Sequence, residues 1–141
     1  MEVDLALLAD AATIDASGKL HILGIFDRIS VAQFPAQHGR VTLVLRFTAG
    51  TSEIGSHDVH IRMSDPGGAE VLSLNGEMQL VGGPSPGDGI RVPHILNLDG
   101  LVFTRPGMYS FDVKVDGEHH VSLPLSVEGP QGRGAAAEEG R

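Results

Sequence analysis

The 141-residue sequence predicts an all-β fold, a sandwich of two antiparallel sheets with about eight strands, of immunoglobulin-like or jelly-roll type. Apolar residues recur at every second position through most of the chain, which is the period of a half-buried strand. Glycine and proline turn signals separate these segments at short intervals. The length suits one domain, assigned to residues 1–128, and residues 129–141 are predicted to be a disordered tail because they lack core-forming side chains.

The first apolar segment, residues 3–12, fits two periods. Leu5, Leu8, Ala9 and Ala12 could share one face of a helix. No capping residue precedes the segment, so we favour a strand.

The second segment, residues 19–31, is apolar on both faces. Leu20, Ile22 and Phe26 alternate with a second apolar set, namely Leu23, Ile25 and Ile29. A strand of this kind lies between two layers or is covered by a partner. We prefer the interpretation that Gly24 bends the strand so that it serves both sheets. The alternative is a homodimer contact through Leu23, Ile25 and Ile29.

The middle of the chain continues the alternation. Residues 40–49 give the clearest pattern, with Val41, Leu43, Leu45 and Phe47 on one face. Residues 59–64, 70–75 and 91–103 are predicted to be further strands, and a continuation of the second past Gly76 to Leu80 is left open. The glycine- and proline-rich residues 82–89 are predicted to form a mobile loop.

The last two strands form a predicted hairpin. Tyr109 and Phe111 begin a strand that alternates to residue 115, and Asp116-Gly117 supplies the two left-handed residues of a type I′ turn. Pro124 lacks an N–H group, so the returning strand should lie at a sheet edge or at a bulge.

Four charged residues stand in apolar context. If Asp10 and Asp27 are buried, each needs an opposite charge. We therefore predict structural ion pairs across neighbouring strands, either Asp10–Arg28 or Asp27–Arg46.

Two motifs resemble a bacterial family of small proteins that is known only as a domain of unknown function. The first is Leu8-Ala9-Asp10-Ala11-Ala12, then Asp15-x-x-Gly18-Lys19-Leu20-x-Ile22-Leu23-Gly24-x-Phe26-Asp27-x-Ile29, followed by Phe34-Pro35. The second runs from Val102-Phe103-x-x-Pro106-Gly107-x-Tyr109 to Val115-Asp116-Gly117, with Pro124-Leu125-x-Val127 at the end. The resemblance covers residues 3–128 and implies no activity, cofactor or site residue.

A search of the sequence for chemistry predicts no catalytic residue, no cofactor and no metal site. The chain has no cysteine, and its seven histidines do not have ligand spacing, since His57 and His60 should point to opposite faces of a strand. Acidic residues at turns are a weak calcium pattern that turn chemistry and an exposed strand face largely explain. They are Asp65, Asp88, Asp99, Asp112 and Asp116.

The net charge of −8 opposes a nucleic-acid or anionic-membrane partner. The acidic start does not resemble a secretory signal, so we expect a cytoplasmic protein. The function predicted is a non-enzymatic interaction or structural module that binds a protein partner or itself. The alternative is a sandwich that binds a small ligand or carbohydrate, although Tyr109 is expected in the core; a metal-dependent hydrolase is the third hypothesis.

Overall fold

The computed structural model describes residues 1–82 and 89–130. The described residues form nine strands and one short 3-10 helix, η1. In chain order these elements are β1 (Glu2–Ile14), β2 (Leu20–Phe26), β3 (Arg28–Ser30), β4 (Ala36–Ala49), η1 (Thr51–Glu53), β5 (Gly55–Ser64), β6 (Glu70–Leu80), β7 (Ile90–Phe103), β8 (Gly107–Val115) and β9 (Glu118–Glu128). The predicted all-β class is confirmed, and residues 3–12 belong to a strand.

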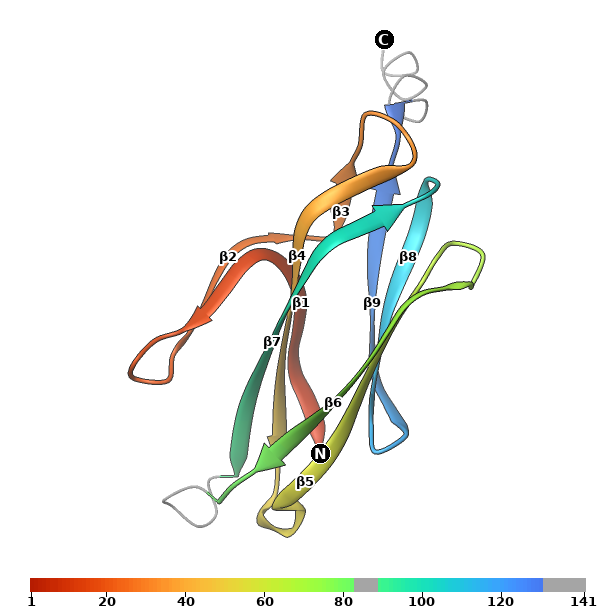
Figure 1. Cartoon of the computed structure of the whole chain (residues 1–141). Coiled ribbons are helices and arrows are strands. Elements are labelled where there is room, and N and C mark those ends of the chain that lie inside the picture. The colour runs from red at the N-terminus through yellow and green to blue at the C-terminus, as the bar shows by residue number, and fades with distance from the viewer. Residues whose placement is uncertain (83–88, 131–141) are drawn as a thin grey trace.

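The strands form two sheets (Figure 1), a four-stranded sheet in the order β2-β1-β4-β7 and a five-stranded sheet in the order β3-β9-β8-β5-β6. Among the described strands, all pairs are antiparallel except β3 with β9, which run parallel. The sandwich is confirmed. The expectation of purely antiparallel pairing fails at β3 because the chain reaches this strand by crossing from the other sheet.

The crossing divides the segment that is apolar on both faces. Residues up to Phe26 pair with β1 in the four-stranded sheet, and residues from Arg28 pair with β9 in the five-stranded sheet. Between them, the Asp27 carbonyl accepts a hydrogen bond from the Ser126 N–H at 2.9 Å. The segment serves both sheets, as the preferred interpretation expected, but the change of sheet occurs at Asp27 and not at Gly24. One predicted strand thus becomes two.

The inner faces of the two sheets enclose the core. Its largest fully buried side chains include Tyr109, Phe47, Phe103 and Phe111. The ring of Tyr109 meets that of Phe103 edge to face at 5.0 Å, and its hydroxyl donates a hydrogen bond to the Arg105 carbonyl at 2.8 Å. Tyr109 is a core residue, as predicted, and therefore offers no surface on which a sugar could stack.

Turn chemistry predicted from the sequence is confirmed in the last hairpin. Asp116 and Gly117 have φ angles of 51° and 82°, the left-handed values that a type I′ turn requires. Strand β3 pairs only with residues 126–128 of β9, so Pro124 lies on a stretch of β9 with no ladder on that side among the described strands.

Most of the predicted loop at 82–89 and of the predicted tail at 129–141 lies outside the described residues. Gly129 is described and is buried, and a side chain there would collide with the ring of Phe34. Within residues 1–82 and 89–130, no helix is long and apolar enough to cross a membrane.

Candidate functional site

The outward face of the four-stranded sheet carries a continuous set of aliphatic side chains, which we call the apolar face. Residues directly opposite each other in a ladder point to the same side of the sheet. Leu7 lies opposite Val44, which lies opposite Ile95. On the next rows, Ile25 lies opposite Ala9 and Leu23 opposite Ala11. The apolar face is defined by Leu7, Ala9, Leu23, Ile25, Val44 and Ile95.

These side chains are separate from the core between the sheets. The core on β4 uses the alternate set, Val41, Leu43, Leu45 and Phe47, and none of the six residues of the apolar face belongs to it. Strand β4 is therefore apolar on both faces along its middle. At the centre of the apolar face, Val44 lies between Leu7 and Ile95 and has 0% of its surface exposed.

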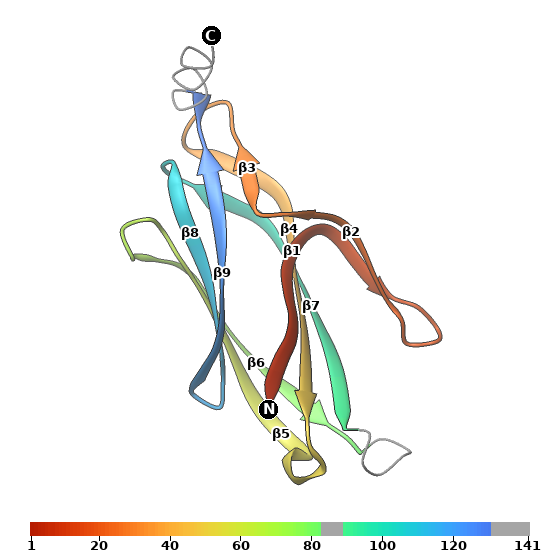
Figure 2. The ribbon, with the colours of Figure 1, turned by 180° about the vertical axis from the view of Figure 1, so that it is seen from behind.

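Exposure on the apolar face is concentrated at β2. Leu23 is 72% exposed and Ile25 is 66% exposed. The hairpin that contains β2 projects sideways from the two sheets, as Figures 1 and 2 show from opposite sides. The sheet therefore presents its most exposed aliphatic side chains on its outermost strand.

Two ion pairs border the apolar face. On one side the Arg46 guanidinium donates to Asp4 at 2.9 Å, and on the other the Arg40 guanidinium donates to Asp99 at 2.6 Å. The hydrogen bond from each arginine lowers the pKa of its aspartate partner below the ordinary value. An apolar centre with a charged rim is the usual composition of a protein–protein contact surface.

Local chemistry fixes the hairpin that carries β2. The Asp15 carboxylate accepts hydrogen bonds from the Ser17 hydroxyl and from the backbone N–H groups of Ser17 and Lys19, and it contacts the His21 ring. These bonds, with that of the Ser17 hydroxyl as the largest cause, hold the pKa of Asp15 far below its ordinary value. Asp15 therefore closes the turn as a charged group.

Gly24 is the second fixed point of β2. Its φ of +72° is left-handed, and a Cβ there would collide with the Asp10 carboxyl. The ladder between β1 and β2 passes over this residue and continues with Leu23 opposite Ala11. The left-handed backbone therefore favours glycine at this position, and any side chain there would also have to displace the exposed Asp10 carboxyl.

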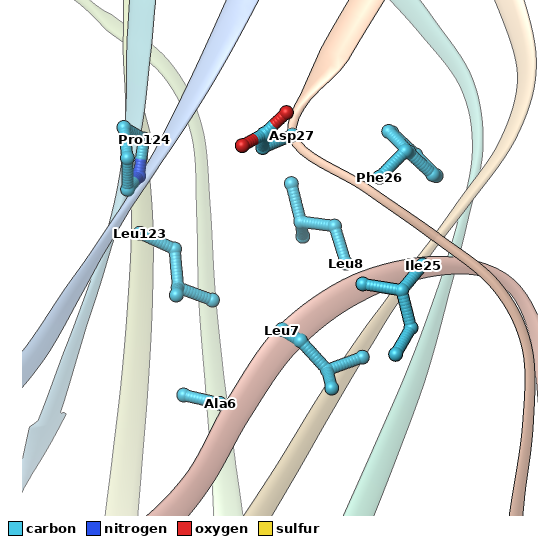
Figure 3. Close-up of a pocket in the computed structure, with 8 residues that line it drawn as sticks. All are labelled: Ala6, Leu7, Leu8, Ile25, Phe26, Asp27, Leu123 and Pro124. Atoms are coloured by element: carbon cyan, nitrogen blue, oxygen red, sulfur yellow. The ribbon is translucent and has the colours of Figure 1, made fainter.

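A cleft opens beside β2 where the chain crosses between the sheets. It has a volume of about 340 Å³ and is lined by β1, by the end of β2 and by Leu123 and Pro124 of β9. Figure 3 shows Leu8, Leu123 and the Asp27 carboxylate around the same hollow. Asp27 is the one acidic or basic residue among the residues that line it.

The outward face of the five-stranded sheet is polar. A cleft of about 310 Å³ there is lined by His60, Arg62, Asp112, Lys114 and His119. Several of these groups already bind each other or their neighbours. The Ser122 hydroxyl lies 2.5 Å from the Asp112 carboxylate and 2.8 Å from the His119 ring, and Arg62 donates to the Gly68 carbonyl at 3.0 Å.

Comparison with known proteins places the chain in a family. Residues 4–128 match the family described as a family of unknown function, DUF6941. The chain belongs to DUF6941. This confirms the resemblance noted in the sequence.

A comparison of this DUF6941 chain with curated proteins finds no match. Among solved structures it is similar to an alkylpurine DNA glycosylase, AlkC of Pseudomonas fluorescens, bound to DNA that contains an abasic site analog. The identity is 13% and the TM-score 0.39, over 90% of this chain and 30% of the glycosylase chain. A likeness at this level carries no argument about function.

The DUF6941 structure divides the predicted interface residues. Leu23 and Ile25 are exposed, but Ile29 is only 6% exposed and belongs to the core. Its assignment to an interface is wrong, because the crossing at Asp27 moves Ile29 to β3, where it packs inside the sandwich.

The predicted ion pairs of the DUF6941 chain are also wrong. Arg46 pairs with Asp4, and Arg28 pairs with Glu128 at 3.4 Å. Asp10 and Asp27 are exposed, and neither belongs to an ion pair within the described residues. Because these two aspartates are solvated, burial does not force them to pair.

The histidines and turn acids lie apart. The His57 Nδ1 donates to the Asp116 carboxylate at 2.6 Å near the start of β5, while His60 lies on the outward face beside Ser73. Asp65 accepts hydrogen bonds from the N–H groups of its own turn. No three His, Asp or Glu side chains in the described part of the chain lie close enough to share a metal ion. Asp88, in the predicted loop, is outside that part.

Sequence reasoning missed most of the apolar face. It did not recognise Val44 as apolar surface, and it did not single out Leu7 or Ile95. A signal was present, because residues 5–9 are apolar at odd and even positions alike.

Proposed function

We propose that this DUF6941 protein is a non-enzymatic interaction module that binds a protein through the apolar face of its four-stranded sheet. The observation that carries the proposal is the pair of exposed side chains on β2, Leu23 and Ile25, beside an outward surface that is already aliphatic. Each would contribute on the order of 1–2 kcal/mol of burial free energy on full coverage. Clustering of such residues within a charged rim supports a binding surface.

The charges support a protein partner over a nucleic acid. The chain carries 18 acidic and 10 basic residues, so its field repels phosphate groups. The basic residues beside the apolar face, Arg40 and Arg46, are neutralised by Asp99 and Asp4.

The titration behaviour supports a binding role over a catalytic one. The groups with shifted pKa values lie mainly in turns and in exposed ion pairs; Asp65, for example, is lowered chiefly by the hydrogen bond from the Ala69 N–H. The largest shift, at Asp15, belongs to the β1–β2 turn. Active sites instead gather shifted groups in one cleft.

The test uses a photoreactive amino acid in place of Leu23, introduced into the full chain in the producing cell. A matched variant carries it in place of Asn75, which is exposed on the outward face of the five-stranded sheet. We expect a discrete protein adduct from position 23 and none from position 75. The adduct should disappear when Ile25→Glu is added. Absence of any adduct at position 23, or the same adducts at both positions, would overturn the proposal.

A second candidate function is binding of a small apolar ligand with a positive group in the cleft beside Asp27. The cleft walls are apolar and its one charged group is a carboxylate, a composition that suits an alkylamine better than a sugar. Calorimetry should detect binding of n-octylamine to the wild-type chain and weaker binding of n-octylamine to the Asp27→Asn variant. Octanoate should not bind to the wild-type chain. Equal binding of amine and carboxylate would remove this candidate.

A further inference from the structure

We infer that the partner of the apolar face is a second copy of this chain, joined edge to edge through antiparallel pairing of β2 with the partner's β2. The inference rests on the proposed function, because it names the protein that covers Leu23 and Ile25. It adds an orientation and a register that can be tested separately.

The edge of β2 is open in the described structure. Strand β2 is the outermost strand of its sheet and pairs with β1 on one side only. An unpaired edge presents backbone N–H and C=O groups that can accept another strand. The hairpin that contains this edge projects away from the rest of the sandwich (Figure 1).

Among the four edge strands of the two sheets, β2 differs in composition. Strand β3 contains Arg28, β6 contains Glu70 and Glu77, and β7 contains Arg91, Pro93 and Asp99. Charged residues and proline on an edge discourage pairing with another chain. The seven residues of β2 contain no Asp, Glu, Lys, Arg or Pro.

Opposite charges at the two ends of β2 select the register. Lys19 immediately precedes the strand and Asp27 immediately follows it. When two copies of residues 20–26 pair antiparallel in full overlap, Lys19 of each copy lies opposite the partner's Asp27. A two-fold interface repeats this complementary contact at both ends. The strand between carries no formal charge with His21 neutral, so the net charge of −8 is not concentrated at the contact.

The same register accounts for the apolar character of both faces of β2. Leu23 lies on the two-fold axis opposite the partner's Leu23, and Ile25 lies opposite the partner's His21, all on the outward face. On the other face, Leu20 lies opposite the partner's Phe26. The ladder is expected to pass over Gly24, as it does on the β1 side. Pairing would therefore extend the apolar face across both copies.

The first experiment is sedimentation equilibrium of the full chain from low to high micromolar concentration. A seven-residue edge contact is small, so we expect a reversible dimer of micromolar affinity. Lys19→Glu and Asp27→Lys should each weaken it about tenfold, because like charges then meet at both ends. The double variant should restore wild-type affinity.

The controls separate this local contact from the net charge. Glu118→Lys is the control for Asp27→Lys, because both raise the net charge equally. Lys114→Glu is the control for Lys19→Glu, because both lower it equally. Lys114 and Glu118 are exposed and lie in the other sheet. We expect both control variants to dimerise like wild type within about twofold. A monomeric wild-type chain, or a double variant that stays as weak as the single ones, would overturn the inference.

A disulfide reports the register directly, because the chain has no cysteine. Leu23→Cys places two thiols opposite each other only if Leu23 lies on the two-fold axis, where Cα atoms are within bonding reach. Mild oxidation should convert this variant to a covalent dimer. His21→Cys, on the same face, should remain monomeric on denaturing gels, and the reverse result would exclude the register.

The two proposals fail differently. If the purified chain is monomeric but position 23 still yields an adduct with another protein in cells, the dimer falls and the interaction module stands. If position 23 yields no adduct and the purified chain is monomeric, both fall.

Discussion

The outward faces of the two sheets differ although both cover the same core. On the four-stranded sheet, Val44 and its neighbours Leu7 and Ile95 are aliphatic, and Val44 is fully buried. On the five-stranded sheet, Lys114 and Asp112 point outward among histidine and serine side chains. A sandwich needs only its inner faces to be apolar. The aliphatic outward face is therefore not required by the architecture, and it is the feature on which the proposed binding function rests.

The largest expected effect comes from placing a charge at the centre of each outward face. Val44→Asp should lower the free energy of unfolding by at least about 3 kcal/mol, because the carboxylate would be buried without a partner. Lys114→Asp, on an exposed position of β8, should change it by no more than about 0.5 kcal/mol. Urea unfolding measures both. Similar losses would mean that the two outward faces are equally solvated.

Each sheet has a hairpin that contains a glycine with left-handed backbone, so substitution of these glycines compares the two hairpins. Gly24→Ala should destabilise the protein by about 1–2 kcal/mol for the left-handed conformation alone, and by more because of the clash with Asp10. Gly117→Ala carries only the first cost, since nothing lies within 4 Å of its Cβ position.

The double variant Asp10→Ala/Gly24→Ala isolates the clash. Relative to Asp10→Ala, the cost of Gly24→Ala should then match that of Gly117→Ala in thermal unfolding. If Gly24→Ala costs the same with and without Asp10, the close approach is not what requires glycine.

A reciprocal exchange should alter surface hydrophobicity with little effect on stability. Leu23→Asn should shorten retention on a hydrophobic-interaction column, and Asn75→Leu should lengthen it. Because Leu23 is 72% exposed, its replacement should change the free energy of unfolding by less than about 1 kcal/mol. A larger loss of stability would show that Leu23 supports the fold of the hairpin.

The smallest effects are expected from pH, and they fall in different ranges for the two sheets. The pKa values of Asp4 and Asp99 are lowered by their arginine partners. The two ion pairs therefore contribute to the free energy of unfolding above the ordinary aspartate pKa of 3.8, and this contribution is lost as the pH falls through the lowered values. The pKa of His57 is raised, chiefly by its hydrogen bond to Asp116. Its contribution is present below the ordinary value of 6.5 and is lost as the pH rises through the raised value.

Two variants test which residues cause the loss of stability in each pH range. Arg40→Gln/Arg46→Gln should reduce the loss of melting temperature in acid, and His57→Gln should reduce the loss that begins above pH 6.5. The two arginine pairs are largely solvent-accessible and the His57–Asp116 pair is half-buried, so each change should be small. An unaltered acid profile in the arginine variant would show that Asp4 and Asp99 do not stabilise the folded state.

The sequence predicted the local structure of this protein well. Alternation in residues 41–47 identified a strand of the core, and Asp116-Gly117 identified the turn of the last hairpin. Both patterns depend on neighbours in the chain. The phase of one strand also placed Leu23 and Ile25 on the same apolar face, which the alternative interpretation assigned to a homodimer contact.

Long-range pairing could not be predicted in this way. Arg46 pairs with Asp4 because β4 lies beside β1 in one particular register, and no property of either residue selects that partner. Ile29 shares an apolar phase with Leu23, but its burial depends on the crossing at Asp27.

The sequence by itself determined the all-β class, most of the strands and the type of the last turn, since local sterics and side-chain period decide these. Only the tertiary structure decided which sheet each half of residues 20–30 joins and which aliphatic side chains gather on one outward face. The physical reason is that strand order and register bring together residues far apart in the chain, and the free energy of those contacts is not encoded in either segment alone.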